Sequence, residues 1–390
     1  MINSPQIKHI LVVFSNFYLT HRLMLNGILQ YASENRASTW RTHLELRDIA
    51  RRNFSELKSG GFDGIIAAII NPADRHTYLS TGLPVVLYEP TIAKWNHFKR
   101  PEHSVTFFND HAEEGRTAAT YFIDRGYRKF AYVGSPQHTV WSDVRREGFV
   151  AALAEKGFRC NVYSLPAETD FMHESKRLVR WLSKLPQGTA LFAMNDERAQ
   201  QIITLADRAR LSIPEHIAVL GVDDDELLCS TASPTLSSIP VYATETGYRF
   251  AKALDDLFHG RYHAPVVRTC HTHVVTRQST DITQIEDPFA SRAVAYMRQH
   301  LGDSIGGREI AAAARCSLRT LQMRMLSALG RTPKQELEFL RRTEAVQLLS
   351  NTSMSVGQIA RTCGFCDSSH LGLHLKRHLG IRPLDVRRQK

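Results

Sequence analysis

The chain of 390 residues has few cysteines and no long apolar stretch. Such sparse cysteines do not build the disulfide framework of a small secreted domain. No run of about 18 apolar residues occurs, so we expect no membrane-spanning helix. Residues 1–14 lack the features of a signal peptide, so we expect a cytoplasmic protein. The six cysteines are Cys160, Cys229, Cys270, Cys316, Cys363 and Cys366.

Motifs of common enzymes on doubly wound sheets are also missing. The sequence has no P-loop, no G-x-G-x-x-G after its first apolar run, no G-x-S-x-G and no H-E-x-x-H. His271 and His273 lack a third ligand, and Cys363-x-x-Cys366 lacks a second pair, so we expect no metal, no cofactor and no catalytic residue. An enzyme on a doubly wound α/β fold with a helical C-terminal domain is the alternative, and turnover of a bound sugar would favour it. A third possibility is a transport-type binding protein, but such a protein would need a signal for export, and the basic C-terminal end also argues against it.

The formal net charge of +10 is concentrated at one end of the chain. Residues 287–390 contain 17 Lys and Arg against 8 Asp and Glu, whereas residues 1–286 contain 32 against 31. A basic domain beside a nearly neutral one is the electrostatic pattern of phosphate binding, although a solvated basic face has the same composition. The C-terminal quarter is therefore the candidate DNA-binding part.

The first two-thirds of the chain alternate short apolar runs with amphipathic stretches. Short, fully apolar strands between helices indicate parallel sheets covered on both faces. There are too many units for one small sheet, so we predict two doubly wound α/β lobes with ligands at the carboxyl ends of the strands. The predicted strands are 9–14, 64–70, 85–88, 130–133, 190–193 and 217–221, and the predicted helices are 21–34, 112–125, 144–156, 174–185 and 197–210.

The pattern changes after Arg277. Residues 278–288 are polar and end in Glu286-Asp287-Pro288, and everything from Phe289 onward is helical in pattern. We therefore predict a sensor domain at 1–281, a linker at 282–288 and an all-α domain with two helix-turn-helix units at 289–390.

The first helix-turn-helix unit covers residues 310–326. Ser317 is a good N-cap, and Leu318, Leu321 and Met325 share one face of the following helix. The other side chains face outward, mostly near the N-terminal end that a recognition helix presents to base edges. The DNA-binding candidates here are Ser317, Arg319, Thr320, Gln322, Met323 and Arg324.

The second unit covers residues 356–371. Gly364 suits the left-handed residue that closes its first helix, Phe365 fills the core, and Leu371 and Leu375 are the buried pair of the next helix. A continuous helix from Pro333 to about residue 349 joins the units; its length of about 25 Å places them roughly one DNA turn apart. The DNA-binding candidates are Ser368, Ser369, His370, Lys376 and Arg377, the last two suited to phosphates.

The C-terminal hundred residues resemble the AraC family. The pattern Gly364-Phe365-x-Asp367-x-Ser369-x-Leu371-x-x-x-Leu375-Lys376-Arg377-His378-x-Gly380-x-x-Pro383 matches that family's signature almost position by position. Departures are mild: leucine replaces the usual phenylalanine at 371 and 375, and cysteine the usual alanine at 363. The resemblance implies binding to double-stranded operator DNA, with RNA polymerase as a partner if the protein is an activator.

Three segments resemble the sensor domain of the LacI/GalR family, which has a periplasmic-binding-protein-like fold. They are residues 125–134, 145–149 and 212–224. The resemblance implies a transcription regulator, expected to be an activator, that binds a monosaccharide in the cleft between its lobes. It further implies D-xylose or a related pentose as effector and a homodimer.

Side chains suited to a sugar follow the predicted strands. Sugars need paired hydrogen bonds from planar polar groups and an aromatic ring against their C–H face. Arg145 offers donors, Trp141 offers a ring, and the acceptors are Asp110, Asn195, Asp196 and Asp223. Asp110 is also a plausible helix N-cap and Trp141 a plausible core residue, while Tyr18 and Glu89 are weaker candidates.

Overall fold

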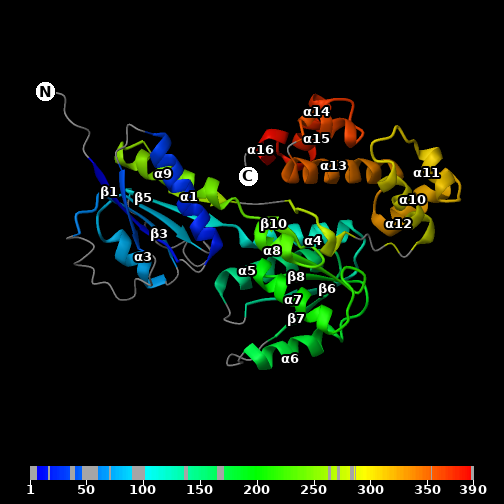
Figure 1. Cartoon of the computed structure of the whole chain (residues 1–390), viewed down its shortest axis with the longest axis horizontal. Coiled ribbons are helices and arrows are strands. Elements are labelled where there is room, and N and C mark those ends of the chain that lie inside the picture. The colour runs from blue at the N-terminus through cyan, green and yellow to red at the C-terminus, as the bar shows by residue number, and fades with distance from the viewer. Residues whose placement is uncertain are drawn as a thin grey trace. The chain divides into compact units, whose positions relative to one another are not determined.

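The computed structural model describes residues 7–15, 18–35, 40–45, 60–69, 72–89, 102–135, 139–164, 171–261, 265–269, 273–281, 285, 287–352 and 354–387. These residues form two compact units. The first lies within Met1–Glu114, Thr139–Arg145 and Val241–His271, and the second within Gly115–His138, Arg146–Pro240 and Thr272–Lys390. Each unit contains one parallel sheet, and the second also contains the C-terminal helices (Figure 1).

The first unit has a six-stranded sheet in the order β11-β5-β4-β3-β1-β2. All its pairings are parallel. The strands are β1 (Lys8–Val13), β2 (Trp40–Glu45), β3 (Gly64–Ala68), β4 (Val85–Glu89), β5 (Ser104–Asn109) and β11 (Val266–Thr269). Its helices are α1 (Leu19–Glu34), α3 (Pro72–Leu79) and α9 (Ala243–Phe258).

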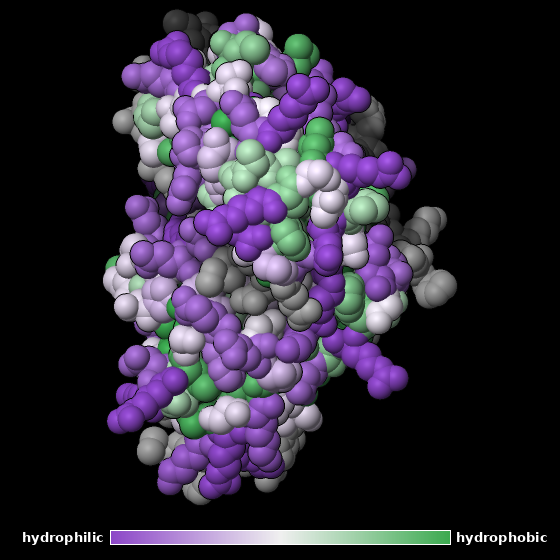
Figure 2. Space-filling model, turned by 90° about the vertical axis from the view of Figure 1, so that its right-hand side faces the viewer, coloured by the Kyte–Doolittle hydropathy of each residue, from purple (hydrophilic) through white to green (hydrophobic). Residues whose placement is uncertain are grey.

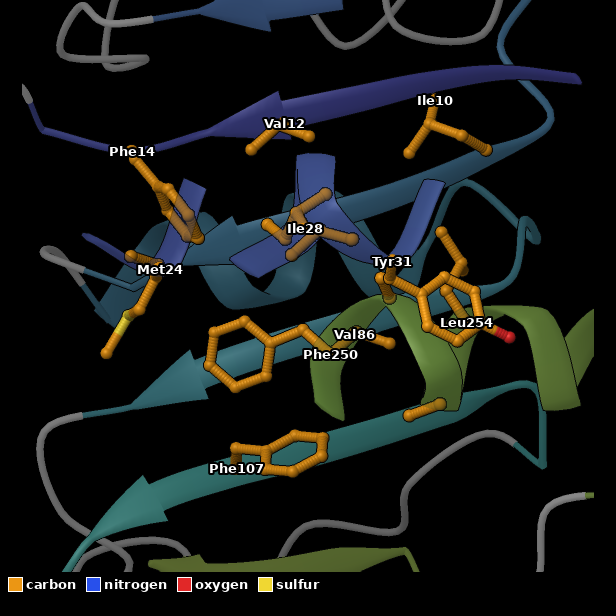
Figure 3. Close-up of a cluster of buried hydrophobic side chains, with 14 of the residues drawn as sticks. Ile10, Val12, Phe14, Met24, Ile28, Tyr31, Val86, Phe107, Phe250 and Leu254 are labelled. Carbon is orange, nitrogen blue, oxygen red and sulfur yellow. The ribbon is translucent and has the colours of Figure 1, made fainter. Parts of the chain in front are cut away.

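Both faces of this sheet are buried because successive side chains of a strand point to opposite sides. Ile10 and Val12 of β1 pack with residues of α1 and α9, including Phe250. Leu11 and Val13 point the other way and pack with Tyr78 of α3. Figure 3 shows the first of these cores, with side chains from α1 and α9 filling the space over the strands. The continuous apolar runs of the sequence follow from this double burial.

The second unit repeats the design with a five-stranded sheet in the order β10-β9-β8-β6-β7, again parallel throughout. Its strands are β6 (Lys129–Val133), β7 (Cys160–Tyr163), β8 (Thr189–Ala193), β9 (Ile217–Asp223) and β10 (Ser237–Pro240). Its helices are α6 (Phe171–Leu182), α7 (Asp196–Arg208), α8 (Glu226–Thr231) and the short 3-10 helix η2 (Gln278–Thr280), while α4 (His111–Asp124) and α5 (Val140–Glu155) cross the boundary between units.

The described residues of the C-terminal part form helices joined by turns, with no strand, and contain two apolar cores. The first core holds Met297, Leu321 and Met325, and the second holds Phe365 and Leu371. The long helix α13 contributes to both cores, so it joins the two bundles. The helices are α10 (Pro288–Gln299), α11 (Gly307–Ala313), α12 (Leu318–Leu329), α13 (Pro333–Asn351), α14 (Val356–Thr362), α15 (Ser368–Leu379) and α16 (Pro383–Arg387).

The predicted fold class is confirmed: two parallel α/β lobes are followed by a helical domain with two helix-turn-helix units. The six predicted strands and five predicted sensor helices are all present, with ends shifted by a few residues. Sequence reasoning did not assign β2, β5, β7, β10, β11, α3, α8 or α9. Three of these strands, β2, β7 and β11, lie at sheet edges and are only partly buried, so their sequences lack a fully apolar run.

No helix among the described residues combines the length and apolar character needed to cross a bilayer. Figure 2 shows one face of the molecule, on which hydrophilic residues predominate with smaller hydrophobic areas between them. Among the described residues, the most exposed of the large apolar side chains are those of Leu227 in α8, Met323 and Leu326 in α12, Leu373 in α15 and Leu384 in α16.

Candidate functional site

The candidate ligand residues lie where the strands of the two sheets end. In a doubly wound sheet the strand order reverses next to the first strand, and loops at that point diverge to leave room for a ligand. In the second unit this reversal falls between β6 and β8. Asn195 and Asp196 follow β8, and Asp223 is the last residue of β9. Glu89 ends β4 and Asp110 follows β5 in the first unit.

Arg145 lies at the centre of a buried polar network in the first unit. Its Nε donates to Oε2 of Glu114 at 2.7 Å, and its Nη2 lies 2.6 Å from the same oxygen. Nδ1 of His111 lies 3.0 Å from that oxygen and 3.2 Å from Nη2 of Arg145. Arg145 is 2 % exposed and Glu114 is fully buried. A buried guanidinium held by a carboxylate is fixed in direction, so its remaining N–H groups are oriented before any ligand arrives.

Two further candidates flank this network. The ring of Trp141 in α5 lies 5.2 Å from the guanidinium carbon of Arg145 and is half-buried. Oδ1 of Asp110 accepts the amide of Glu113, so Asp110 is the N-cap residue that its position suggested, and its Oδ2 lies 2.6 Å from Nη2 of Arg268. Asp110 therefore has structural partners already, whereas Trp141 presents part of its ring to solvent.

Glu89 and its surroundings are a stronger feature than the sequence indicated. Glu89 is fully buried, and Nε of Arg75 in α3 donates to its Oε1 at 2.7 Å. In the same unit, His21 lies among the rings of Phe14, Tyr18 and Tyr88. Burial lowers the pKa of His21 to about 4, so this imidazole is neutral at pH 7. In the sequence, Glu89 could be noticed as a charged residue directly after an apolar run. No sequence pattern pointed to Arg75.

Asp196 is buried beneath the loop that follows β9. Its Oδ1 accepts the hydroxyl of Ser238 at 2.6 Å, and its Oδ2 accepts the amide of Asp225 at 2.8 Å. Burial raises the pKa of Asp196 well above its usual range, and the charge of Asp223 adds to the effect. Asn195, beside it, caps α7 by accepting the amide of Arg198 at 3.0 Å. Both side chains thus organise the loops around them.

Asp223 and Asp224 have left-handed backbone conformations, with φ of 110° and 54°. Non-glycine residues with positive φ are uncommon and strained, and such strain is often found at functional sites. Asp225 ends the strained segment by capping α8 through the amide of Leu227 at 2.9 Å. Arg277 lies 2.8 Å from Oδ1 of Asp224. The loop is therefore held at several points while Asp223 stays partly exposed at the strand end.

The first candidate recognition helix is α12. Ser317 caps it by accepting the amide of Thr320 at 3.1 Å, and Leu321 and Met325 are fully buried. On the other side Arg319, Gln322, Met323 and Arg324 are exposed and Thr320 is half-buried. Arg324 is engaged by Oδ2 of Asp287 at 3.0 Å, so it has an internal partner.

The second candidate recognition helix is α15, capped by Asp367 through the amide of His370 at 2.7 Å. Gly364 has a φ of 74°, as its position in the turn required, and Leu371 and Leu375 are fully buried. The exposed residues include all five candidates: Ser368, Ser369, His370, Lys376 and Arg377. His374 is between them; burial and the charges of His378 and Arg342 lower its pKa to about 4. Cys363 is buried and Cys366 exposed in the turn.

Comparison with known families gives the same two parts. Residues 119–280 match the periplasmic binding protein-like domain, and residues 310–389 match a helix-turn-helix domain. The chain therefore combines a periplasmic-binding-protein-like domain with a helix-turn-helix domain, which is the domain composition of a transcription regulator.

Two relatives match almost the whole chain, and a third matches 70% of it. The xylose operon regulatory protein of Haemophilus influenzae is 25% identical over 98% of this chain and 99% of its own length. The solved structure of the xylose-binding transcription activator XylR superposes with a TM-score of 0.62 at 23% identity, covering 98% of both chains. A LacI family regulator from Enterococcus faecium with bound ribose has a TM-score of 0.57 at 21% identity, covering 70% of this chain and 98% of its own.

Proposed function

We propose that this protein is a sugar-responsive transcription activator of a sugar-utilisation operon, with D-xylose or a related pentose as effector. The observation that carries the proposal is the combination in one chain of strand-end polar groups and two capped, exposed recognition helices. The names of the relatives support a sugar effector and favour D-xylose. A regulator that binds operator DNA acts in the cytoplasm.

The charges around the strand ends favour an uncharged ligand. Glu114 is paired with Arg145 and Glu89 with Arg75, and further pairs join Asp110 to Arg268 and Asp224 to Arg277. A buried charge is costly unless it is paired, and these groups already pair with one another, so the charge of an ionised ligand would itself need a new partner. The hydroxyl groups of a sugar can donate to a carboxylate such as that of Asp223, or accept from a guanidinium such as that of Arg145, without adding charge.

The DNA-binding part is proposed to span residues 289–390, with the sensor at 1–281 and a linker at 282–288. Residues 282–284 and 286 lie outside the described residues. The basic excess and both helix-turn-helix units fall within 289–390. We propose that the protein acts as a homodimer, since a dimeric Lac repressor is among its structural neighbours, with a TM-score of 0.55. We also propose that it contacts RNA polymerase when it activates.

Titration calorimetry of the full chain with D-xylose, L-arabinose, D-ribose, D-glucose and D-glucuronate tests the effector. We expect a pentose to bind and D-glucuronate, which differs from D-glucose by a carboxylate, not to bind. Operator fragments selected from genomic DNA should then show a changed affinity or footprint when the binding sugar saturates the protein. Binding of the charged sugar alone, or an operator affinity and footprint that no sugar alters, would overturn the proposal.

A further inference from the structure

Within the second unit, an arginine of the helical domain binds the end of a sensor helix. Nη1 of Arg331 lies 3.1 Å from Oδ1 of Asp124, and its Nη2 donates to the backbone carbonyl of Asp124. Asp124 is the last residue of α4. The last carbonyls of a helix have no partner inside the helix, and a cation there also interacts favourably with the helix dipole. Arg331 therefore caps α4.

A second arginine makes the same contact in the opposite direction. Nη2 of Arg128, which precedes β6 in the sensor, donates to the carbonyl of Ala328 at 2.9 Å. Ala328 is in the last turn of α12, the first candidate recognition helix, which ends at the left-handed Gly330. Each domain thus supplies an arginine that caps a helix of the other. The sensor binds the C-terminal end of α12, and the exposed DNA-binding candidates lie towards the N-terminal end of that helix.

Buried groups support the contact from both sides. Nε of Arg331 donates to Oε2 of Glu336 at 2.6 Å, and its guanidinium lies 4.3 Å from the ring of Phe339. On the sensor side, Arg125 lies 3.7 Å from the ring of Tyr121 and 5.9 Å from that of Phe339. Glu336 is 1% exposed and Arg125 is 5% exposed. Exposed ion pairs contribute little, but this one is fixed by buried partners.

Charged groups hold the contact, although apolar residues of the first helical core, Leu301, Phe339 and Leu340, lie beside them. A cavity of about 220 Å³ adjoins it, lined by Asp124, Arg125, Glu336 and Glu344 among others. Interfaces between domains that move are typically small and polar, whereas large apolar ones are permanent. This junction therefore has the composition of one that can open.

Helix α4 links this junction to the candidate ligand network. Glu114, in the first turn of α4, binds Arg145, and Asp124, at the other end of the same helix, binds Arg331. We propose that the exchanged arginines Arg331 and Arg128 are the coupling contact of this regulator. A ligand that binds the N–H groups of Arg145 changes the geometry of its pair with Glu114, shifts α4 and thereby loosens or tightens the hold on α12. The identity of the ligand in this inference rests on the proposed function; the contact itself does not.

The test uses the full chain with Asp124→Ala and Arg128→Ala together. This double variant removes the sensor side chains of the contact, and Arg331 keeps only Glu336 and the backbone carbonyl of residue 124. The matched control is Asp207→Ala with Lys129→Ala. Asp207 is exposed on α7, and Lys129 donates to the carbonyl of Gln187 within the sensor. Each double variant removes one acidic and one basic side chain. The net charge therefore stays that of the parent in both, and a difference in DNA affinity between them cannot come from net charge.

Hydrogen–deuterium exchange of peptides covering residues 318–342 tests the contact without any sugar. We expect exchange several-fold faster in the Asp124, Arg128 variant and parent-like exchange in the control. Equal exchange in all three proteins would overturn the contact.

Operator affinity with and without saturating D-xylose tests the coupling. We expect the ratio of the two dissociation constants to fall towards one in the Asp124, Arg128 variant and to stay at the parent's value in the control. By linkage, the effect of operator on sugar affinity should fall by the same factor. A ratio within twofold of the parent's would refute the coupling. A parent that responds to no sugar would contradict the proposed function, and the exchange measurement would still decide the contact.

Discussion

Oδ1 of Asp196 accepts a hydrogen bond from the hydroxyl of Ser238 at 2.6 Å. Through this bond and the amide of Asp225, one buried carboxylate joins the start of α7 to the loop after β9 and to β10. Asp223, the last residue of β9, lies directly before that loop and is a ligand candidate. We therefore expect Asp196 to influence ligand binding by positioning Asp223 rather than by touching the ligand.

Replacing Gly221 by alanine tests this positioning. A Cβ at residue 221 would lie 2.1 Å from Oδ1 of Asp196, so the carboxylate must move. We expect a loss of stability of about 1–3 kcal/mol from overpacking and a loss of sugar affinity of roughly tenfold. Gly357→Ala in α14 is the control, since its Cβ meets only the end of Arg361 at 4.0 Å. Unchanged calorimetric affinity of the Gly221 variant would contradict the expectation.

Arg145 stabilises the fold through its pair with Glu114, so Arg145→Ala should affect stability as well as ligand binding. Arg145→Ala leaves the fully buried carboxylate of Glu114 without its guanidinium, and breaking a buried pair in this way costs about 3–5 kcal/mol. We expect lower stability as well as lost sugar binding, measured by urea unfolding and calorimetry.

The double variant Arg145→Met with Glu114→Gln separates the two effects. Removing both charges avoids the unpaired carboxylate, so we expect stability closer to the parent's but still no sugar binding. Sugar affinity equal to the parent's in this double variant would show that the network is not part of the ligand site.

Stability should fall with acid because of His21. Its folded-state pKa of about 4 lies below the ordinary value of 6.5, so the folded protein binds fewer protons than the unfolded chain between these values. Stability is fully present above pH 6.5 and decreases as the pH falls towards 4, by up to about 3 kcal/mol. His21→Gln should flatten this part of the pH profile in urea unfolding. His259→Gln, at an exposed position, is the control, and identical slopes in all three proteins would exclude His21 as the cause.

The two recognition helices should respond differently to alanine substitution. Arg319 is exposed at the N-terminal end of α12, so Arg319→Ala should relax base preference at one operator position, at a cost of about 1–3 kcal/mol for the best site. Lys376→Ala should weaken binding to all sequences alike and reduce the salt dependence by about one phosphate contact. Arg180→Ala, exposed on α6 of the sensor, is the control. A uniform loss of affinity in Arg319→Ala, together with altered base preference in Lys376→Ala, would mean that Arg319 contacts phosphate and Lys376 contacts a base.

Much of this architecture is local enough to be predicted from the residues. The apolar runs of β1, β3 and β8 are buried on both faces, and this burial produces an unbroken pattern in the sequence. In the helical end, Ser317 and Asp367 cap their helices and Gly364 takes a positive φ, because caps and turns depend on a few neighbouring residues.

The sequence by itself therefore determined the α/β lobes, the two helix-turn-helix units and the position of the candidate residues at strand ends. Only the tertiary structure decided which of those residues have partners. Glu114 binds Arg145 from another helix, Ser238 binds Asp196 from another strand, and Arg331 reaches α4 from about 200 residues away. Such pairs depend on how distant segments pack, and a single sequence contains no periodicity or spacing that records them.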